Sequence, residues 1–401
     1  MDLGAFHFLL SEAGERRLAA LTAEPITAAN HLQLAMGLRE AFSPEASHAL
    51  LETALLRQKG RDKFSRAEEM YFTREALEQA SSEAVSHYRA ARYAAAGMRT
   101  VADLGCSIGG DALALAAHCM VIGIDRDPLR LAMARENVAA YGRGNHFQPL
   151  LADLEALPPL DVDAFFFDPA RRDEQGRRLF SVHDYHPPLS LTERWLPSVP
   201  HGAVKISPGV DYAELPSEAE VEFISLDGEV KEGVLWYGEL GSGVQRRATL
   251  LPGAHTLSDA DNSGEPSPVT GVRRFLYEPD GAVIRAHLVQ TLAQRLDATR
   301  IDEAIAYLTA DQAQETPFAR CFVVEEVLPF HLKRLRRRLQ ERGIGRVTIK
   351  KRGSPLEPDE LRRRLRLSGP EVAILFLTHV QGEPSVLIGQ EYTPPTPQLK
   401  S

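Results

Sequence analysis

Between Arg99 and Leu240 the chain alternates short apolar runs with longer amphipathic stretches. TVADLG, MVIGID, FQPLLAD, AFFFDP and GAVKISP read as buried strands, whereas DALALAAH and PLRLAMARENVAAYG have helical spacing. Strands and helices that alternate at this pitch favour a parallel sheet with right-handed crossovers. VEFISL and GVLWYGEL are joined so tightly that they are expected to be antiparallel. The pattern predicts a doubly wound, seven-stranded α/β core that closes with a hairpin.

The sequence before this core and the sequence after it differ from it in composition and in hydrophobic pattern. The N-terminal part is rich in Ala, Leu, Glu and Arg at helical spacing, which predicts a helical domain. After the core, GAHTLSDADNSGEPSPVTG reads as a linker or exposed loop. The expected segments are an N-terminal helical domain at 1–97, the α/β core at 98–252, a small α/β module at 272–318 and a basic α+β domain at 319–395.

Cysteine content and hydropathy limit the cellular compartments and the kinds of metal site that fit this sequence. The three cysteines, Cys106, Cys119 and Cys321, lack CxxC spacing, which argues against a disulfide framework and a zinc site. No metal is therefore expected, and a reducing, cytoplasmic compartment fits best. No apolar run approaches the roughly 18 residues of a membrane span, and the N-terminus does not resemble a signal peptide.

A glycine-rich turn, VADLGCSIGGDALALA, follows the first strand of the core. The strand is expected to end at Asp103 and the next helix to start near Asp111. Gly105 and Gly109 would let the backbone turn sharply and approach a ligand closely, and Ser107 stands where nucleotide-binding folds often carry a middle glycine. Such a turn can also be purely structural, but the order strand, turn and helix favours a ligand site.

Acidic residues also follow the next two strands. Asp125 ends VIGID, about 20 residues beyond the turn, where a carboxylate can accept hydrogen bonds from a ribose diol. Asp153 ends FQPLLAD, where an acid can meet an adenine amino group. Either one alone could be a solvated loop acid. Together with Asp103 they mark the carboxyl edge of the sheet, where open α/β folds bind ligands.

The motifs ADLGCSIGGD, IGIDRD and LLAD resemble the first three motifs of the class I S-adenosylmethionine (SAM)-dependent methyltransferases, whose Rossmann-like core also ends in an antiparallel hairpin. The resemblance implies that Asp103, Gly105 and Gly109 surround the methionine part of SAM, that Asp125 holds its ribose and that Asp153 lies near its adenine. NAD is the alternative cofactor, although the SxGG turn and the hairpin favour SAM. The same motifs add three expected cofactor-binding residues: Cys106, Ser107 and Arg126.

The fourth strand ends in FFFDPARR, where methyltransferases that act on amines carry an Asp/Asn-Pro-Pro-aromatic motif. Asp168, Pro169 and Arg171 are the expected catalytic residues. The carboxylate and the following backbone carbonyl could orient an exocyclic amine towards the methyl group, since direct transfer depends mainly on alignment. Ala170 replaces the second proline and Arg171 replaces the aromatic residue, so Arg171 and Arg172 could instead bind a phosphate.

Other residues admit a structural or a functional interpretation. Lys205 ends the fifth strand and could reach the site, but a surface lysine is the favoured interpretation. Phe64, Tyr71 and Phe72 could stack on a base if the N-terminal segment folds over the cofactor pocket. At helical spacing, aromatic residues more often belong to the core.

A strongly basic stretch lies between Lys333 and Arg366. It carries fourteen basic and four acidic residues, although the whole chain has a net charge of −9. Such a concentration is typical of a nucleic-acid-binding surface. The alternative is a pair of solvated helices whose arginine stems cover apolar surface.

KFSRAEEMYFTREALEQAS, FFFDPARR, PGVDYAELP, VIRAHLVQTLAQRL and IKKRGSPLEPDELRRRLRLSG extend the resemblance over most of the chain. They resemble a bacterial group with the DPAR signature, in which an N-terminal helical region, a methyltransferase core, a ferredoxin-like module and a THUMP-like domain follow one another. Because THUMP-type domains bind RNA, the resemblance implies an RNA methyltransferase that methylates a base amine. A small-molecule or protein methyltransferase and a catalytically silent RNA-binding protein are the alternatives.

Overall fold

The structure, a computed structural model, describes residues 1–170, 179, 181–262 and 264–394. The chain divides into two compact units. The first joins Met1–Val221 to Lys231–Gly243, and the second joins Glu222–Val230 to Val244–Ser401. Within the described ranges, no helix is long and apolar enough to cross a membrane.

The first unit begins with the expected helices. Side chains of Asp2, Ser11, Ser43 and Thr73 accept hydrogen bonds from first-turn amides and so fix four of the helix starts. The six helices are α1 (Leu3–Leu9), α2 (Glu12–Thr22), α3 (His31–Ala41), α4 (Pro44–Gly60), α5 (Arg74–Gln79) and α6 (Glu83–Ala95).

The aromatic residues of the segment between α4 and α5 are buried. Phe64, Tyr71 and Phe72 are each at most 6% exposed, and the Tyr71 ring meets Phe6 edge to face at 5.1 Å. The core interpretation of these three residues is confirmed, because a ring buried in this way has no face left for a base.

The large sheet has the strand order β3-β2-β1-β4-β5-β7-β6-β8-β9. β1 pairs in parallel with β2 and β4, as the sequence pattern predicted, whereas β5 pairs antiparallel with β7. Its strands are β1 (Thr100–Leu104), β2 (Met120–Asp125), β3 (Phe147–Leu151), β4 (Ala164–Phe167), β5 (Gly202–Ile206), β6 (Glu220–Leu226), β7 (Glu229–Tyr237), β8 (Arg246–Leu251) and β9 (His255–Ser258).

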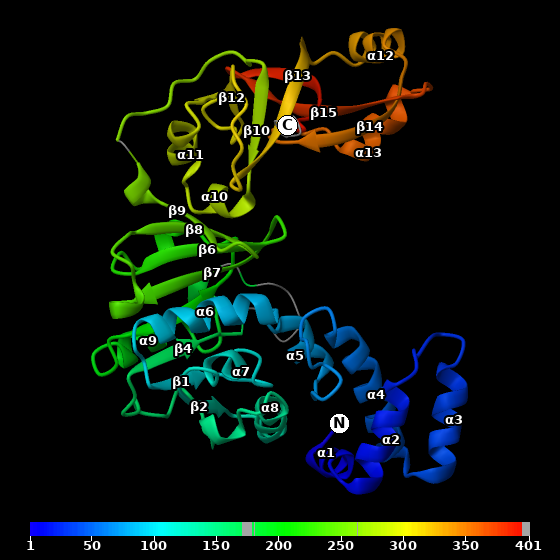
Figure 1. Cartoon of the computed structure of the whole chain (residues 1–401), viewed down its shortest axis with the longest axis vertical. Coiled ribbons are helices and arrows are strands. Elements are labelled where there is room, and N and C mark those ends of the chain that lie inside the picture. Colours follow the sequence, from blue (N-terminus) through cyan, green and yellow to red (C-terminus); the bar gives the residue numbers. More distant parts are fainter. Residues whose placement is uncertain (171–178, 180, 263, 395–401) are drawn as a thin grey trace, which may run out of the picture. The chain divides into compact units, whose positions relative to one another are not determined.

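The seven strands expected for the core are β1 to β7, and β8 and β9 extend the same sheet beyond the hairpin. Asp227 and Gly228 connect β6 to β7 with φ of +53° and +79°, the backbone that a two-residue hairpin turn requires. β4 and β5 are buried along their whole length, because helices cover the sheet. Figure 1 shows α6 beside α7 (Ala112–Leu115), which in turn packs against α8 (Pro128–Ala140). A further helix of this unit, α9, spans Leu191–Trp195.

The second unit contains another sheet, with strand order β11-β12-β10-β13-β16-β15-β14. Strands from 272–318 and from 319–395 thus share one sheet. The strands are β10 (Phe275–Pro279), β11 (Thr299–Arg300), β12 (Leu308–Ala310), β13 (Ala319–Pro329), β14 (Ile344–Lys351), β15 (Glu371–Val380) and β16 (Glu383–Glu391). The helices of this part are α10 (Gly281–Arg285), α11 (Val289–Arg295), α12 (Leu332–Glu341) and α13 (Pro358–Leu365).

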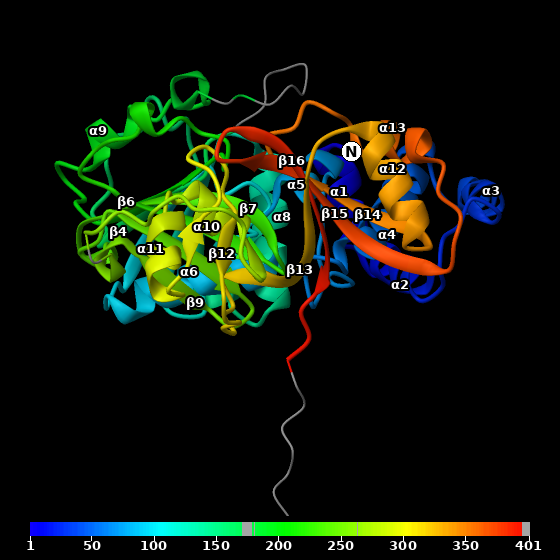
Figure 2. The same cartoon turned by 90° about the horizontal axis from the view of Figure 1, so that it is seen from above.

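The two arginine-rich helices, α12 and α13, pack against this second sheet through their leucines. Leu335 and Leu339 of α12, and Leu361 and Leu365 of α13, are buried in one cluster with β15 and β16. Figure 2 shows α12 and α13 next to each other beside β14. The leucine spacing leaves the arginines between them on the outer faces of the helices.

Candidate functional site

The glycine-rich turn lies between β1 and α7, at the carboxyl end of β1. Gly105 and Gly109 have φ of +82° and +79°, and Ser107 has φ of +49°. The amides of Gly105 and Cys106 both donate to the carbonyl of Ile124 at 2.9 Å, which ties the turn to β2. A Cβ on Gly109 would lie 3.2 Å from the Cα and Cβ of Ala134 in α8, so the turn and that helix approach too closely for a side chain.

Asp103 points a buried carboxylate into this region. It is 1% exposed, and its Oδ2 has no hydrogen-bond partner among the residues that the structure describes. Burial raises the pKa of Asp103 well above its usual range, and Asp111 and Asp168 raise it further. A buried, unpaired carboxyl oxygen is costly unless a ligand satisfies it, and a cation suits it best.

Asp125 is held in place by the same turn. Its Oδ2 accepts from the Ser107 amide at 2.9 Å and its Oδ1 from the Asp127 amide at 2.8 Å. The structure therefore brings Ser107 and Asp125 together and aims the carboxylate with two backbone amides. Each oxygen retains a second lone pair that a diol could use.

The other expected cofactor residues are less tightly placed. Asp153 is exposed, two residues beyond the end of β3, and its Oδ1 accepts from the Glu155 amide at 3.0 Å. Arg126 is exposed. Cys106 is buried, and burial together with Asp103 raises the pKa of its thiol well above the ordinary value.

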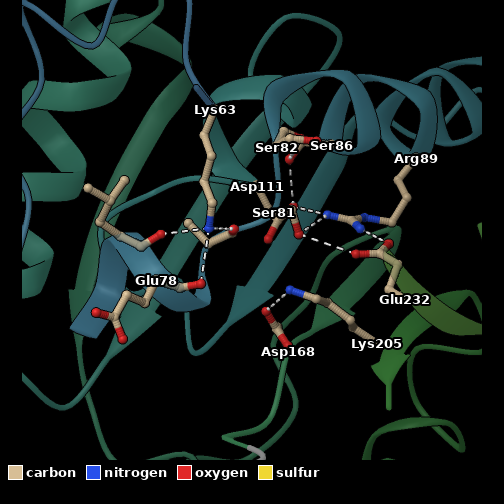
Figure 3. Close-up of polar contacts among 12 residues, drawn as sticks. Lys63, Glu78, Ser81, Ser82, Ser86, Arg89, Asp111, Asp168, Lys205 and Glu232 are labelled. Carbon is tan, nitrogen blue, oxygen red and sulfur yellow. Dashed lines mark hydrogen bonds and ion pairs between the residues drawn. The ribbon is translucent and has the colours of Figure 1, made fainter. Parts of the chain in front are cut away.

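Asp168 lies just beyond β4 and pairs with Lys205 at the end of β5. Lys205 Nζ and Asp168 Oδ2 are 2.6 Å apart, and the lysine side chain is only 3% exposed (Figure 3). The favoured interpretation of Lys205 as a surface lysine is wrong. Its side chain is buried near the end of β5 and faces Asp168. The Asp168 backbone also adjoins the turn, since a Cβ on Gly105 would lie 3.7 Å from the Asp168 carbonyl oxygen.

The rest of the DPAR motif is only partly described. Pro169 is buried and Ala170 is exposed, with Ala170 exchanging backbone hydrogen bonds with His186 at 2.9 and 3.2 Å. Arg171 and Arg172 lie outside the described residues, so both interpretations of Arg171 stay predictions.

A buried charged network that sequence analysis missed adjoins the turn. Arg89 of α6 forms ion pairs with Asp111, the residue before α7, and with Glu232 of β7. Ser81 joins Arg89 and Glu232 through its hydroxyl (Figure 3). Burial by itself would raise the pKa of Asp111, but Arg89 and Lys205 outweigh it and hold that pKa below its ordinary value. No local motif marks Arg89, because its partners lie 22 and 143 residues away.

The N-terminal segment packs directly on the turn. A Cβ on Gly110 would lie 3.6 Å from both Phe64 and Ala80, and Asn137 of α8 bonds the backbone of Tyr71 and of Ile108. Lys63 donates to the carbonyls of Leu77, Glu78 and Ala80 at 2.7 to 3.0 Å, which fixes the loop before α6. Burial and the nearby Lys205 lower the pKa of Lys63. This segment therefore forms one wall beside the turn.

The basic stretch of the second unit is only partly neutralised. Its four acids are all ion-paired, and Glu278, Glu325 and Glu326 from elsewhere pair with further cations. Five exposed cations of the stretch make no ion pair within the described part of the chain: Lys333, Arg334, Arg346, Arg363 and Arg366. Across the described residues, no cluster of three or more His, Cys, Asp or Glu side chains could hold a metal.

Comparison with known proteins gives the family of the chain. Two relatives from Mycobacterium tuberculosis, strains CDC 1551 / Oshkosh and ATCC 25618 / H37Rv, are uncharacterized SAM-dependent methyltransferases. Each is 39% identical over 347 residues, which cover 82% of this chain and 92% of the relative. A methyltransferase structure from Porphyromonas gingivalis W83 is 22% identical and shares the fold, with a TM-score of 0.73 over 92% of this chain and 100% of that one.

Two family profiles match parts of the chain. The THUMP domain-like family matches residues 319–391, and a domain of unknown function, DUF8688, matches residues 2–60. The first match spans β13 to β16 and therefore includes both basic helices. With 39% identity to two SAM-dependent methyltransferases over most of its length, the chain belongs to the SAM-dependent methyltransferases.

Proposed function

We propose that this methyltransferase acts on RNA and methylates an exocyclic amine of a base. One observation carries the choice of RNA: the THUMP domain-like match at 319–391 contains exposed cations of α12, β14 and α13 that make no ion pair with the described residues. Phosphates are the ligands that such cations favour. A small uncharged substrate would leave these charges without a role.

The cofactor site proposed for SAM lies at the carboxyl ends of β1, β2 and β3. The orphan Oδ2 of Asp103 fits the positive charge of the cofactor, and the Asp125 carboxylate, held by two amides, fits a ribose diol. Gly105 and Gly109 let the backbone approach the cofactor closely. Asp153 is proposed to lie near the adenine. Bound SAM supplies an electrophilic methyl group on a sulfonium.

The acceptor amine is proposed to lie against Asp168 and Pro169. A carboxylate oxygen and the backbone carbonyl of Pro169 accept hydrogen bonds from the two N–H groups and so direct the nitrogen lone pair. Lys205 is a positioning residue here, because its ammonium holds Asp168 Oδ2 at 2.6 Å and fixes the carboxylate plane. The nitrogen sheds one proton once it gains the methyl carbon, and the neighbouring carboxylate is its nearest acceptor.

The test is transfer of a tritiated methyl group from SAM to bulk RNA taken from cells that lack this gene. We expect label that ribonuclease releases and that chromatography assigns to a nucleoside with a methylated exocyclic nitrogen. Label on a ribose oxygen or a ring carbon would contradict the amine acceptor. Label in protein or in small molecules alone would contradict RNA as the substrate.

A double charge-reversal variant tests the proposed RNA-binding surface separately from the catalytic site. Arg363→Glu/Arg366→Glu should weaken RNA binding and flatten its dependence on salt, since fewer counterions are then released. Arg39→Glu, at an exposed position on α3, is the matched control and should change neither. SAM affinity should be the same in all three proteins.

A further inference from the structure

The second unit contains a pocket that the proposed catalytic site does not use. Its volume is about 510 Å³, within the roughly 300–1,000 Å³ of small-molecule sites. It lies where β13 runs into α12, where α13 ends and where the β15–β16 hairpin turns. The residues that matter most for its chemistry are Phe330, Leu332, Leu356, Arg364, Thr378 and His379.

Two polar residues at the end of β15, Thr378 and His379, belong to the lining of this pocket. Thr378 is 2% exposed, and its hydroxyl is buried without a hydrogen-bond partner in the described ranges. The half-buried ring of His379 likewise makes no hydrogen bond or ion pair with any described residue. Side chains alternate along β15, so Thr378 lies on the sheet face of Phe376, whereas His379 lies on the face of Leu377, which lines the pocket. The His379 ring is therefore the polar side chain of this strand that a ligand in the pocket would meet.

The apolar part of the lining suits a flat ring. Phe330, Leu332 and Leu356 pack on the core beneath α12 and α13 and leave part of their surface to the pocket. Arg364 presents a guanidinium from the last turn of α13. Aromatic rings and guanidinium planes are the groups on which unpaired bases stack.

We infer that this pocket takes one unstacked nucleobase of a single-stranded RNA segment, held between an aromatic or guanidinium face and the His379 side chain. The inference rests on the proposed RNA substrate and assigns a specific contact to it. Cations adjoin the pocket along the chain, since Lys333 and Arg334 follow Leu332 and Arg363 precedes Arg364. These charges favour a ligand that carries phosphates on either side of the base over an apolar peptide.

The experiment compares pocket variants of the full chain by fluorescence anisotropy, with a labelled twelve-nucleotide single strand and with the same strand in a perfect duplex. Ser354→Trp would fill the pocket from its loop side, and Phe330→Ala would remove a stacking face. Ser368→Trp, at an exposed loop position of the same unit outside the lining, is the matched control. Circular dichroism and thermal melting identify any variant that fails to fold.

We expect Ser354→Trp and Phe330→Ala to weaken single-strand binding by roughly five- to hundredfold, as for the loss of one stacked base, and to leave duplex binding unchanged. Photocrosslinking of a 5-iodouridine strand should mark peptides that contain Phe330 or His379. Unchanged single-strand affinity in both folded variants, or an equal loss in Ser368→Trp, overturns the pocket assignment while the RNA substrate stands. If the unmodified chain binds no RNA at all, the proposed substrate fails as well.

Discussion

Lys205 Nζ donates to Asp168 Oδ2 across 2.6 Å, and this ion pair joins the ends of two neighbouring strands, β4 and β5. The lysine is almost fully buried, whereas the aspartate is 23% exposed. Burying an ammonium costs free energy unless a partner compensates it, so the pair locks the carboxylate in a single position. In the proposed reaction this is the carboxylate that meets the acceptor.

Lys205→Met should lower the turnover number at least tenfold and leave SAM affinity nearly unchanged, because the acceptor side of the site loses its alignment. The free energy of unfolding should fall by about 3 kcal/mol, since a buried pair is broken from one side. Calorimetry, urea unfolding and initial rates measure the three quantities. The double variant Lys205→Met/Asp168→Asn should regain stability but not turnover. If Lys205→Met kept full turnover, the ion pair would contribute to stability only and would not position the acceptor.

Gly109→Ala should weaken SAM binding about tenfold or more. Its Cβ would lie 3.2 Å from Ala134, and the left-handed backbone adds about 1 kcal/mol of strain. Gly97→Ala is the control, because Gly97 has φ of +73° but no described heavy atom lies within 4 Å of a Cβ there. Titration calorimetry should therefore show unchanged SAM affinity for Gly97→Ala. Equal affinities in both variants would mean that the turn does not contact the cofactor.

SAM affinity should rise with pH over the range in which Asp103 ionises. Burial raises the pKa of Asp103 in the free protein, so just above the ordinary aspartate range the carboxyl is still protonated. A bound cation favours the ionised form, and binding therefore releases a proton below the raised pKa and none above it. Calorimetry in buffers of different ionisation enthalpy counts that proton. Asp103→Asn should abolish the release, and proton release that persists in this variant would assign it to another group.

Arg89→Met should be among the most destabilising single substitutions in the first unit. It would leave Asp111 and Glu232 as buried, uncompensated acids, which typically costs about 3–5 kcal/mol. Arg130→Met breaks the more exposed pair with Glu75 and should cost less than about 1 kcal/mol. Urea unfolding at neutral pH compares the two. A similar small loss in both would show that the network contributes little to holding α6 against the sheet.

Sequence alone determined the parts of this protein that local pattern encodes. The succession of strands β1 to β7 along the chain followed from apolar runs and helical spacing, because each element buries its own face. The SAM dependence was implied by the resemblance of the motifs around Asp103, Gly105 and Asp125 to those of class I methyltransferases.

Only the tertiary structure decided which charges are buried together. Lys205 and Asp168 are 37 residues apart, and Arg89 and Glu232 are 143 residues apart, so no periodicity connects them. Parallel pairing of β4 with β5 and the packing of α6 near β7 bring them within bonding distance. The continuation of the sheet through β8 and β9 has the same origin, since an edge strand is defined by its partner and not by its own sequence.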